Sequence, residues 1–270
     1  MPTPASTPAS ASVLAPAAEP VTLGVSLKMY FGHHETLNWA RRIAALADRH
    51  PAVTGGTVRL FVLPAFPAIV PVTGVLAGSG VAVGSQDIAT EDAGPYTGEV
   101  SGASLKEIGC AYAEVGHAER RRLYGEGDTV VAAKTAAALR NGLTPVLCVG
   151  ELDRAPSDEA ARRTVAEAER LLHGLTGPVV LAYEPQWAIG APEPASADHI
   201  TTVCAALTDW LAAHPAHRGS TVIYGGSAGP GLLTRLGPAV GGLFLGRFAH
   251  DTAAVERILD EAVALTGAVA

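Results

Sequence analysis

Three residues with titratable side chains, Lys28, His117 and Glu184, each follow a short apolar run of the sequence. Glu184 also opens a loop framed by Pro185 and Gly190, where an enzyme would hold a general base beneath a lid. A carboxylate can remove a proton from a carbon next to a carbonyl if donors stabilise the oxygen that gains negative charge. With an imidazole and a lysine as donors, the three residues predict proton transfer between carbons without a metal or a cofactor.

Each of these residues also has an ordinary structural interpretation. A glutamate after a strand can be a surface or capping residue, a lone histidine can be half-buried with satisfied hydrogen bonds, and a lysine can pack its stem along the surface. The segment after His117 favours catalysis, because a helix that begins there would disfavour the imidazolium and keep a neutral donor ring. Glu119 and Arg120 are expected to support the site, although they could be only a helix-start acid and a solvated cation.

Two glycine-containing loops predict an anion-binding site. The segments 224–229 (YGGSAG) and 242–247 (GLFLGR) each run from an apolar strand through glycine toward a helix start. Backbone N–H groups in such loops can approach an anion closely, and a helix N-terminus favours negative charge. Either loop alone could be an ordinary turn. The candidate phosphate-binding residues are Gly226, Ser227, Gly246 and Arg247.

Short apolar segments alternate along the chain with alanine-rich segments, which predicts alternating strands and helices. The expected strands are 21–27, 57–63, 80–86, 111–116, 143–149, 178–184, 220–225 and 241–246. The expected helices are 36–49, 67–77, 103–108, 129–140, 158–173, 196–213, 229–236 and 251–265. Helix caps are expected at Asp128, Ser157, Ser196 and Asp251.

Eight strand–helix pairs predict an α/β fold, the (β/α)₈ TIM barrel, rather than a doubly wound sheet, because the glycine-rich dinucleotide turn after the first strand is missing. In such a barrel the residues that follow the strands gather at one face, and phosphate commonly binds after strands seven and eight. The candidate base, imidazole and lysine all follow strands, so we expect them at that face.

Composition disfavours several classes of protein. The 270-residue chain is 48% hydrophobic and 17% charged, which predicts extensive burial. The net charge of -7 disfavours nucleic acid and favours a small acidic ligand held in a local cationic pocket. The three cysteines lack paired spacing, so we expect no disulfide framework or zinc site, and a reducing cytoplasm suits them. No apolar stretch is long enough to predict a membrane span.

Residues 1–20 are almost wholly Ala, Pro, Ser and Thr, a composition that cannot bury enough surface to order itself. They lack the basic start and sustained apolar run of a secretory signal. We therefore expect a disordered tail over residues 1–20 and a single barrel domain over residues 21–270.

From about Val21 to its C-terminus the chain resembles the triosephosphate isomerase family. The resemblance rests on motifs in the family's order: Tyr96-Thr-Gly-Glu-Val100, Cys110-Ala-Tyr-Ala-Glu-Val-Gly-His-Ala-Glu-Arg-Arg121, Pro145-Val-Leu-Cys-Val-Gly-Glu151, Ala182-Tyr-Glu-Pro-Gln-Trp-Ala-Ile-Gly190 and Tyr224-Gly-Gly-Ser227. It implies that Glu184 is the catalytic base, His117 the neutral electrophile and Lys28 the cation near the phosphate and the oxyanion.

The resemblance also implies how the substrate is held and how the chain assembles. Residues 185–192 would form a closing lid, and the loop 86–99 would dock into a second subunit, which implies a homodimer. The backbone that binds phosphate would come from Gly190, Ser227 and Gly246.

The sequence departs from the family around the substrate. Ser26 stands where the family has asparagine, so a long amide donor has become a short hydroxyl near the reacting carbonyl. Ala118 replaces a serine whose hydroxyl could hold the base in the open enzyme, and Pro192 stiffens the far hinge of the lid. Arg247 replaces a glycine, and it could grip phosphate, reshape the far end of the pocket, or point outward.

These departures spare the proton-transfer residues, which predicts retained chemistry on an altered substrate. We expect an aldose–ketose isomerase for a short phosphorylated sugar, with dihydroxyacetone phosphate and glyceraldehyde 3-phosphate as the reference pair. The alternative substrates are L-erythrulose 1-phosphate and D-erythrulose 4-phosphate of tetritol breakdown. A third interpretation, motivated by the lost asparagine and the altered lid, is a catalytically weak barrel that serves as a binding protein.

Overall fold

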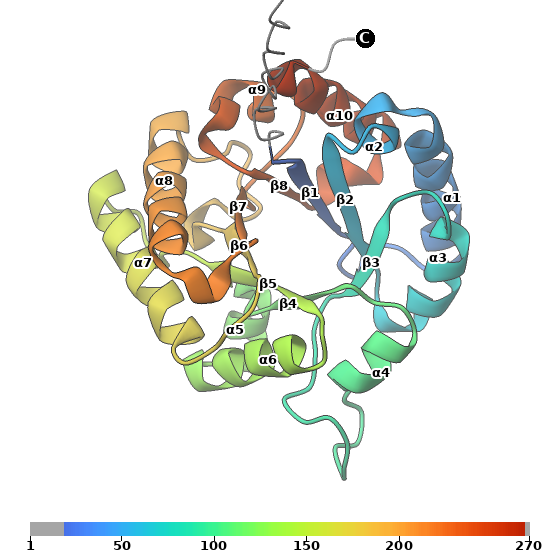
Figure 1. Ribbon diagram of the computed structural model, residues 1–270, viewed down its shortest axis with the longest axis horizontal. Helices are drawn as coiled ribbons and strands as arrows, with labels where there is room; N and C mark the ends of the chain where they lie inside the picture. The colour runs from blue at the N-terminus through green and yellow to red at the C-terminus, as the bar shows by residue number, and fades with distance from the viewer. Residues whose placement is uncertain (1–18, 268–270) are drawn as a thin grey trace, which may run out of the picture.

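In a computed structural model, which describes residues 19–267, eight parallel strands close into a barrel in chain order (Figure 1). This confirms the predicted (β/α)₈ barrel. Residues 1–18 of the expected tail lie outside the described residues. The strands are β1 (Val21–Ser26), β2 (Val58–Leu63), β3 (Ala82–Ser85), β4 (Tyr112–Val115), β5 (Thr144–Val149), β6 (Val180–Tyr183), β7 (Thr221–Tyr224) and β8 (Gly242–Leu245).

Helices surround the barrel as an outer ring (Figure 1). The α-helices are α1 (His33–Arg49), α2 (Pro51–Thr54), α3 (Ile69–Leu76), α4 (Gly102–Glu107), α5 (Ala118–Tyr124), α6 (Asp128–Arg140), α7 (Ser157–Leu172), α8 (Ala197–Ala213), α9 (Leu232–Leu236) and α10 (Thr252–Thr266). Short 3₁₀ helices are η1 (Phe66–Ala68), η2 (Gln186–Ala188), η3 (Pro215–His217), η4 (Gly237–Ala239) and η5 (Arg247–His250). Among residues 19–267, no helix is both long enough and apolar enough to cross a membrane.

Two of the four expected helix caps are wrong. Ser196 and Asp251 accept hydrogen bonds from the first turns of α8 and α10, as expected. Asp128 is the first residue of α6, and its carboxylate binds Arg121 instead of the helix backbone. Ser157 likewise lies inside α7, after Pro156. Both errors are one-residue shifts, because the preceding residue carries the extended backbone that a cap requires.

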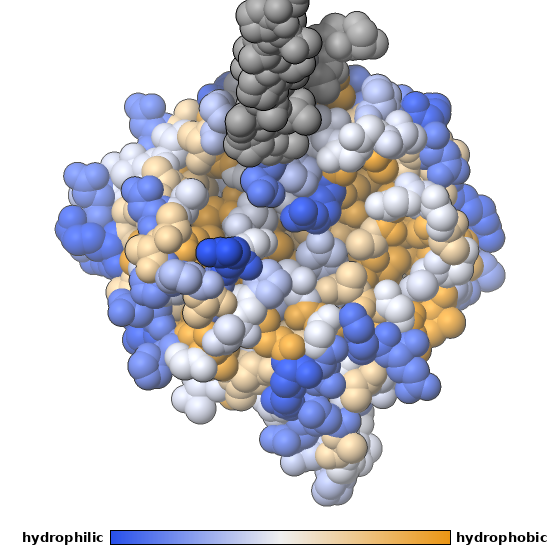
Figure 2. Space-filling view, viewed as in Figure 1, coloured by the Kyte–Doolittle hydropathy of each residue, from blue (hydrophilic) through white to orange (hydrophobic). Residues whose placement is uncertain are grey.

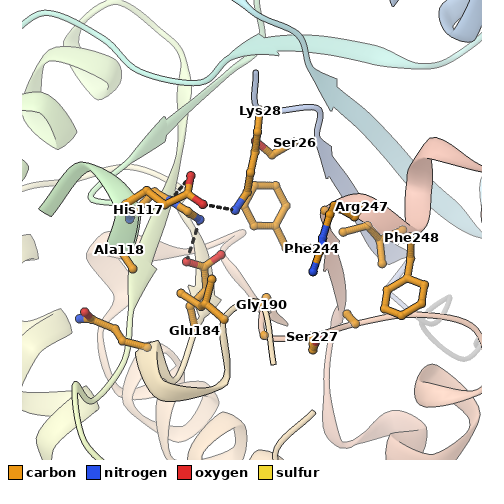
Figure 3. A pocket seen from close by; sticks show the side chains of 18 of the residues that line it. Ser26, Lys28, His117, Ala118, Glu184, Gly190, Ser227, Phe244, Arg247 and Phe248 are labelled. Atoms are coloured by element: carbon orange, nitrogen blue, oxygen red, sulfur yellow. Dashed lines mark hydrogen bonds and ion pairs between the residues drawn. The ribbon is translucent and has the colours of Figure 1, made fainter. Parts of the chain in front are cut away.

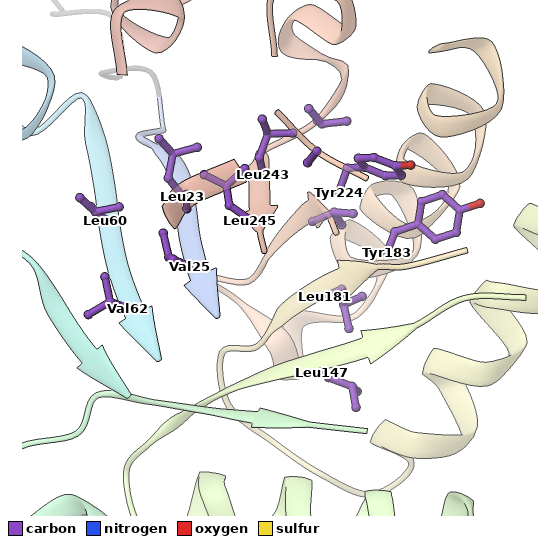
Figure 4. Packing of buried hydrophobic residues seen from close by; sticks show 14 of the residues in the cluster. Leu23, Val25, Leu60, Val62, Leu147, Leu181, Tyr183, Tyr224, Leu243 and Leu245 are labelled. Atoms are coloured by element: carbon purple, nitrogen blue, oxygen red, sulfur yellow. The ribbon is translucent and has the colours of Figure 1, made fainter. Parts of the chain in front are cut away.

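The strands pack apolar side chains on both faces. Outward-facing residues lie between the strands and the helices, where Figure 4 shows Leu23, Val25, Leu181 and Leu243. A second set fills the interior of the barrel: Phe61, Leu63, Tyr112, Val146, Cys148, Val180, Ala182, Ile223 and Phe244. Burial of both faces explains why each strand reads as a continuous apolar run in the sequence.

Glycine is needed at one interior position of β1. A Cβ atom on Gly24 would overlap the rings of Phe61 and Phe244. Gly24 therefore faces the barrel interior, and so do Thr22 and Ser26, two residues before and after it, because side chains alternate along a strand.

A long loop between β3 and α4, residues 86–101, projects from the rim of the barrel (Figure 1). Its residues 91–99 are all exposed. In the same view, hydrophilic residues gather on the outer helices, whereas hydrophobic residues show mainly between the helices and the barrel (Figure 2).

Candidate active site

A pocket of about 370 Å³ opens at the carboxyl ends of the strands. It brings together residues that follow different strands, as Figure 3 shows for Lys28, His117 and Glu184. The other predicted substrate-binding residues also line it: Ser26, Gly190, Ser227, Gly246 and Arg247. Residues far apart in the sequence meet here because parallel strands place their carboxyl ends at one face.

Lys28 is held in a strained backbone conformation. Its φ of 50° lies in the left-handed region that residues other than glycine rarely adopt. The side-chain amide of Gln86 donates to the Lys28 carbonyl at 3.0 Å, which helps to fix that conformation. Lys28 Nζ lies 2.8 Å from Glu119 Oε1. Burial disfavours its charge, but this ion pair more than compensates, so the pKa of Lys28 is raised and the side chain is a cation.

His117 directly precedes α5, and a hydrogen bond to its ring fixes the tautomer. The backbone N–H of Glu119 donates to His117 Nδ1 at 3.1 Å, so Nδ1 is the unprotonated nitrogen of the neutral ring. The proton then resides on Nε2, which lies 3.6 Å from Glu184 Oε2. Burial, followed by the nearby Lys28 cation, lowers the pKa of His117 to about 4. The sequence pointed to the helix as the cause of neutrality, whereas burial is the larger one.

Glu184 follows β6 and is almost fully buried. Burial, together with the neighbouring Glu114 carboxyl, raises the pKa of Glu184 well above its usual value. Its Oε2 atom has no hydrogen-bond partner within residues 19–267. Gly225 leaves room for it, because an added Cβ would lie 2.8 Å from Glu184 Oε1. The result is a carboxylate with high proton affinity that is poised in the pocket.

The two glycine-containing loops also reach the pocket, but they differ from expectation in one respect. After β7, residues 225–231 intervene before α9 begins, so Ser227 does not lie at a helix start. After β8, Gly246 leads directly into η5. The Arg247 side chain extends into the pocket, toward the side on which Gly190 and Ser227 lie (Figure 3). This contradicts the outward-pointing alternative for Arg247.

The loop after Glu184 is tethered at several points. Trp187 Nε1 donates to Glu151 Oε1 at 2.9 Å, and Tyr183 and His199 also contact the Glu151 carboxylate. At its far end the backbone N–H of Ala195 donates to the Tyr224 hydroxyl at 3.2 Å. Ser227 Oγ donates to the Ala191 carbonyl at 2.6 Å. The end of β7 thus holds the segment that the sequence identified as a lid.

The two expected supporting residues have different neighbours. Glu119 belongs to the pocket through its ion pair with Lys28. Arg120 binds Asp87 at 2.8 Å and Glu126 at 2.6 Å, beneath the loop that follows β3. Arg120 therefore supports the scaffold instead of lining the pocket.

Sequence reasoning missed Glu114 and Glu151. Glu151 was quoted only within a motif, yet it anchors the lid. Glu114 lies in β4, is 3% exposed, and receives a hydrogen bond from Ser26 Oγ at 3.0 Å. The available signal was a single carboxylate inside the apolar run Tyr112-Ala-Glu-Val115, which is a costly residue to bury without a role.

Comparison with known proteins relates this geometry to one family. The model of the family described as triosephosphate isomerase matches residues 21–262. An L-erythrulose-1-phosphate isomerase of Pectobacterium atrosepticum is 55% identical over 91% of this chain and 97% of its own length. A second protein of that name, from Rhizobium etli, is 40% identical over 92% of this chain and 94% of its own.

Triosephosphate isomerases themselves are also similar. That of Mycobacteroides abscessus is 42% identical over 74% of this chain and 80% of its own length. The crystal structure of triosephosphate isomerase from Bartonella henselae superposes with a TM-score of 0.78 at 27% identity, and covers 90% of this chain and 98% of that one.

Proposed function

Because this chain belongs to the triosephosphate isomerase family and is an isomerase of that type, we propose that it interconverts L-erythrulose 1-phosphate and D-erythrulose 4-phosphate. The observation that carries the proposal is the high identity, over nearly the whole chain, to a protein named for the first of these compounds. Ser26 supports it, because a short hydroxyl in the pocket leaves more room at the reacting carbon than the asparagine of the family.

The proposed reaction moves one proton between two carbons and one between their oxygens, which shifts the carbonyl from C2 to C3. In L-erythrulose 1-phosphate the C2 carbonyl lies next to C3, which carries a hydrogen, a hydroxyl and the terminal C4 hydroxymethyl group. Glu184 removes the C3 proton, and the C2 oxygen becomes the enediolate oxygen. His117 Nε2 and the Lys28 ammonium donate to that oxygen. His117 Nε2 passes a proton to the C2 oxygen and takes up the proton of the C3 hydroxyl, and Glu184 returns the carbon-bound proton to C2. With the C3 oxygen now the carbonyl, the product is the 4-phosphate ketose.

The phosphate of the substrate is proposed to lie between the loops after β6, β7 and β8. Backbone N–H groups of Gly190, Ser227 and Gly246 supply donors there, and Arg247 adds a guanidinium. A planar guanidinium can bind two phosphate oxygens at once, which fixes orientation as well as charge. Closure of the lid would then exclude water from the enediolate.

Interconversion of dihydroxyacetone phosphate and glyceraldehyde 3-phosphate is the second candidate. The same base and donors would serve it, since the three-carbon compound only lacks the hydroxymethyl group. The similarity to triosephosphate isomerases supports this alternative, at 42% identity over 74% of the chain for that of Mycobacteroides abscessus.

Parallel steady-state kinetics with both substrates tests the assignment. We expect the larger kcat/KM with L-erythrulose 1-phosphate; a clear preference for the three-carbon pair would reverse the order of the two candidates. Proton exchange provides the chemical test, since enediolate formation in deuterated water places deuterium next to the carbonyl. If no candidate sugar acquired deuterium, the protein would be a binding protein and not an isomerase.

We further infer that the protein works as a homodimer. The projecting loop carries Tyr96, 48% exposed, while Met29 and Tyr30, beside the site, are 92% and 54% exposed. Apolar side chains exposed to this degree beside a projecting loop support docking between two copies. Sedimentation at micromolar concentration should give twice the chain mass, and Tyr96→Asp should lower it; a single-chain mass for the unaltered protein would contradict the inference.

We place the enzyme in the cytoplasm. The cysteines Cys110, Cys148 and Cys204 are buried free thiols, which supports a reducing compartment. Fractionation of cells that express the chain at native level should recover it with the cytoplasmic enzymes.

A further inference from the structure

Glu114 is a buried carboxyl group that the proposed proton transfer does not use. It lies on β4 and faces the barrel interior, as does Tyr112 two residues earlier, whose ring stacks on Phe61 at 4.2 Å between centroids. Apolar side chains make up most of the interior around these residues. A carboxyl in such a place is costly unless it is hydrogen-bonded.

Its hydrogen-bond partner is Ser26, which lines the pocket. Ser26 Oγ and Glu114 Oε2 lie 3.0 Å apart, and both residues are nearly inaccessible, at 4% and 3% exposure. Their strands, β1 and β4, are not neighbours in the barrel, so the contact crosses the interior. Glu114 therefore lies behind Ser26: it does not line the pocket, and its hydrogen bond to the pocket wall is made with the serine hydroxyl.

The hydrogen bond to Glu114 decides what Ser26 offers to a ligand. Burial raises the pKa of Glu114 to about 8, although the Ser26 hydrogen bond and the Lys28 cation oppose the shift. The Ser26 hydroxyl donates its proton to Glu114 Oε2. A serine oxygen whose proton is engaged in this way still has lone pairs that can accept a hydrogen bond from a ligand hydroxyl in the pocket.

Ser26 lies where the end of the substrate opposite to the phosphate would arrive. In Figure 3 the Ser26 side chain lies above the level of the Glu184 carboxyl, and Gly190 and Ser227 of the phosphate loops lie below it. If the phosphate occupies those loops and C3 lies against Glu184, the carbon chain continues toward Ser26. The group that follows C3 is the C4 hydroxymethyl, which the three-carbon substrate lacks.

We propose that the Ser26 hydroxyl binds the terminal C4 hydroxyl of the four-carbon substrate and that Glu114 is the positioning residue that orients it. The inference rests on the proposed function and adds the element of the pocket that recognises the fourth carbon. A site built to hydrogen-bond a hydroxyl rejects an analogue without it, because its own polar groups are then left unpaired.

The test compares L-erythrulose 1-phosphate with its 4-deoxy analogue, which lacks only the terminal hydroxyl. We expect the unaltered enzyme to favour the natural compound by about 10- to 100-fold in kcat/KM. In Glu114→Leu, which keeps the volume and removes the hydrogen bond, the ratio should fall to about threefold or less. Loss of the Glu114 carboxyl also alters the environment of Glu184, but that effect acts on both compounds and cancels in the ratio.

Two further variants separate positioning from general damage. Glu114→Gln retains a side-chain oxygen that can accept from the Ser26 hydroxyl and should restore most of the discrimination. Thr22→Val is the matched control: Thr22 is another buried interior residue of β1, and its hydroxyl has no partner among residues 19–267. It should leave the ratio unchanged. If circular dichroism shows that Glu114→Leu does not fold, Ser26→Ala and Glu114→Gln replace it in the comparison. Discrimination against the 4-deoxy analogue should be lost in Ser26→Ala and retained in Glu114→Gln.

The outcomes distinguish this inference from the proposed function. If the unaltered enzyme uses the 4-deoxy analogue as well as the natural compound, or if Glu114→Leu keeps the discrimination, the role of Ser26 and Glu114 is overturned while the substrate assignment stands. If neither four-carbon compound reacts and the three-carbon pair does, the substrate assignment fails and this inference fails with it.

Discussion

At the scale of single residues, burial sets the protonation states that the chemistry needs. The same low-polarity surroundings raise the pKa of Glu184, which makes it a stronger base, and lower the pKa of His117, which keeps it a neutral donor. Lys28 remains a cation in the same pocket because Glu119 is directly paired with it. One site therefore holds a base, a neutral donor and a cation at once.

The first prediction concerns the base. Glu184→Gln preserves size but removes proton affinity, so turnover of the preferred sugar phosphate should fall by several orders of magnitude while the circular dichroism spectrum is retained. The matched control is Glu159→Gln, a change at a surface glutamate of α7 that should leave turnover intact. Near-normal turnover in Glu184→Gln would remove Glu184 from the role of base.

The second prediction concerns the charge of His117. Its pKa of about 4 lies below the ordinary value of 6.5, so the ring stays neutral at every pH above about 5. Nitrogen-15 NMR of the ring should show Nε2 protonated and Nδ1 unprotonated from pH 5.5 to 8, with no titration step. The His117 ring signals are identified as those that disappear from the spectrum of His117→Gln. A midpoint near 6.5 for those signals would contradict the burial argument.

The third prediction concerns Arg247. Arg247→Gly restores the residue usual in the family, so we expect preference to shift from the four-carbon toward the three-carbon substrate, by about tenfold in the ratio of kcat/KM values. Arg247→Lys, which keeps the charge but loses the planar fork, should fall between the two. If Arg247→Gly lowered kcat/KM equally for both substrates, Arg247 would serve phosphate binding alone.

At the scale of elements, the ends of the strands position both the chemistry and the lid. The far end of the lid is tied through Ala191 to Ser227, in the loop after β7. The segment that follows the lid is tied to the last residue of β7, because the Ala195 N–H donates to the Tyr224 hydroxyl. The near end of the lid is tied to the loop after β5 through Glu151. The lid is therefore anchored to strand ends and to the loops that directly follow strands.

The fourth prediction tests that anchoring. Tyr224→Phe keeps a buried ring but removes the acceptor for the Ala195 N–H, so kcat/KM should fall by about tenfold, the worth of one hydrogen bond, with little change in melting temperature. Tyr124→Phe is the control, because that tyrosine is exposed on α5. Unchanged kinetics in Tyr224→Phe would show that this bond does not matter to lid closure.

At the scale of the whole molecule, a buried charge network fastens the projecting loop to the barrel. Lys134 Nζ lies 2.6 Å from both Asp87 Oδ1 and Glu126 Oε1, and Arg120 contacts the same two carboxylates. Asp87 follows β3 at the base of the loop, while Lys134 lies on α6. The network thus couples the proposed dimer loop to the scaffold around the site.

The fifth prediction measures this network. Lys134→Met keeps most of the side-chain volume but removes the buried one of the two cations that bind Asp87 and Glu126, so the free energy of unfolding should fall by about 3–5 kcal/mol. Chemical denaturation provides the measurement. The surface pair of Arg163 with Glu159 supplies the control, since Arg163→Met should cost less than about 1 kcal/mol. If Lys134→Met and Arg163→Met lowered the free energy of unfolding equally, the buried Lys134 contacts would be no stronger than a surface ion pair.

The sequence by itself determined the barrel and most of its pocket. Strand order followed from local apolar runs, because both faces of each strand are buried, and Lys28, His117 and Glu184 were marked by their places at strand ends. The helix boundaries followed less well from the sequence. The expected helices did not include α2 or α5, although a helix start after His117 was expected. The expected helix 229–236 begins only at Leu232. Such ends depend on backbone geometry that local composition fixes weakly.

Only the tertiary structure decided which distant side chains meet. Ser26 and Glu114 are 88 residues apart on strands that are not adjacent, and Lys28 meets Glu119 across 91 residues. The tautomer of His117 and the inward direction of Arg247 likewise depend on contacts and not on composition. The physical reason is that barrel closure and strand register bring side chains across the interior, and local patterns along the chain carry no information about that distance.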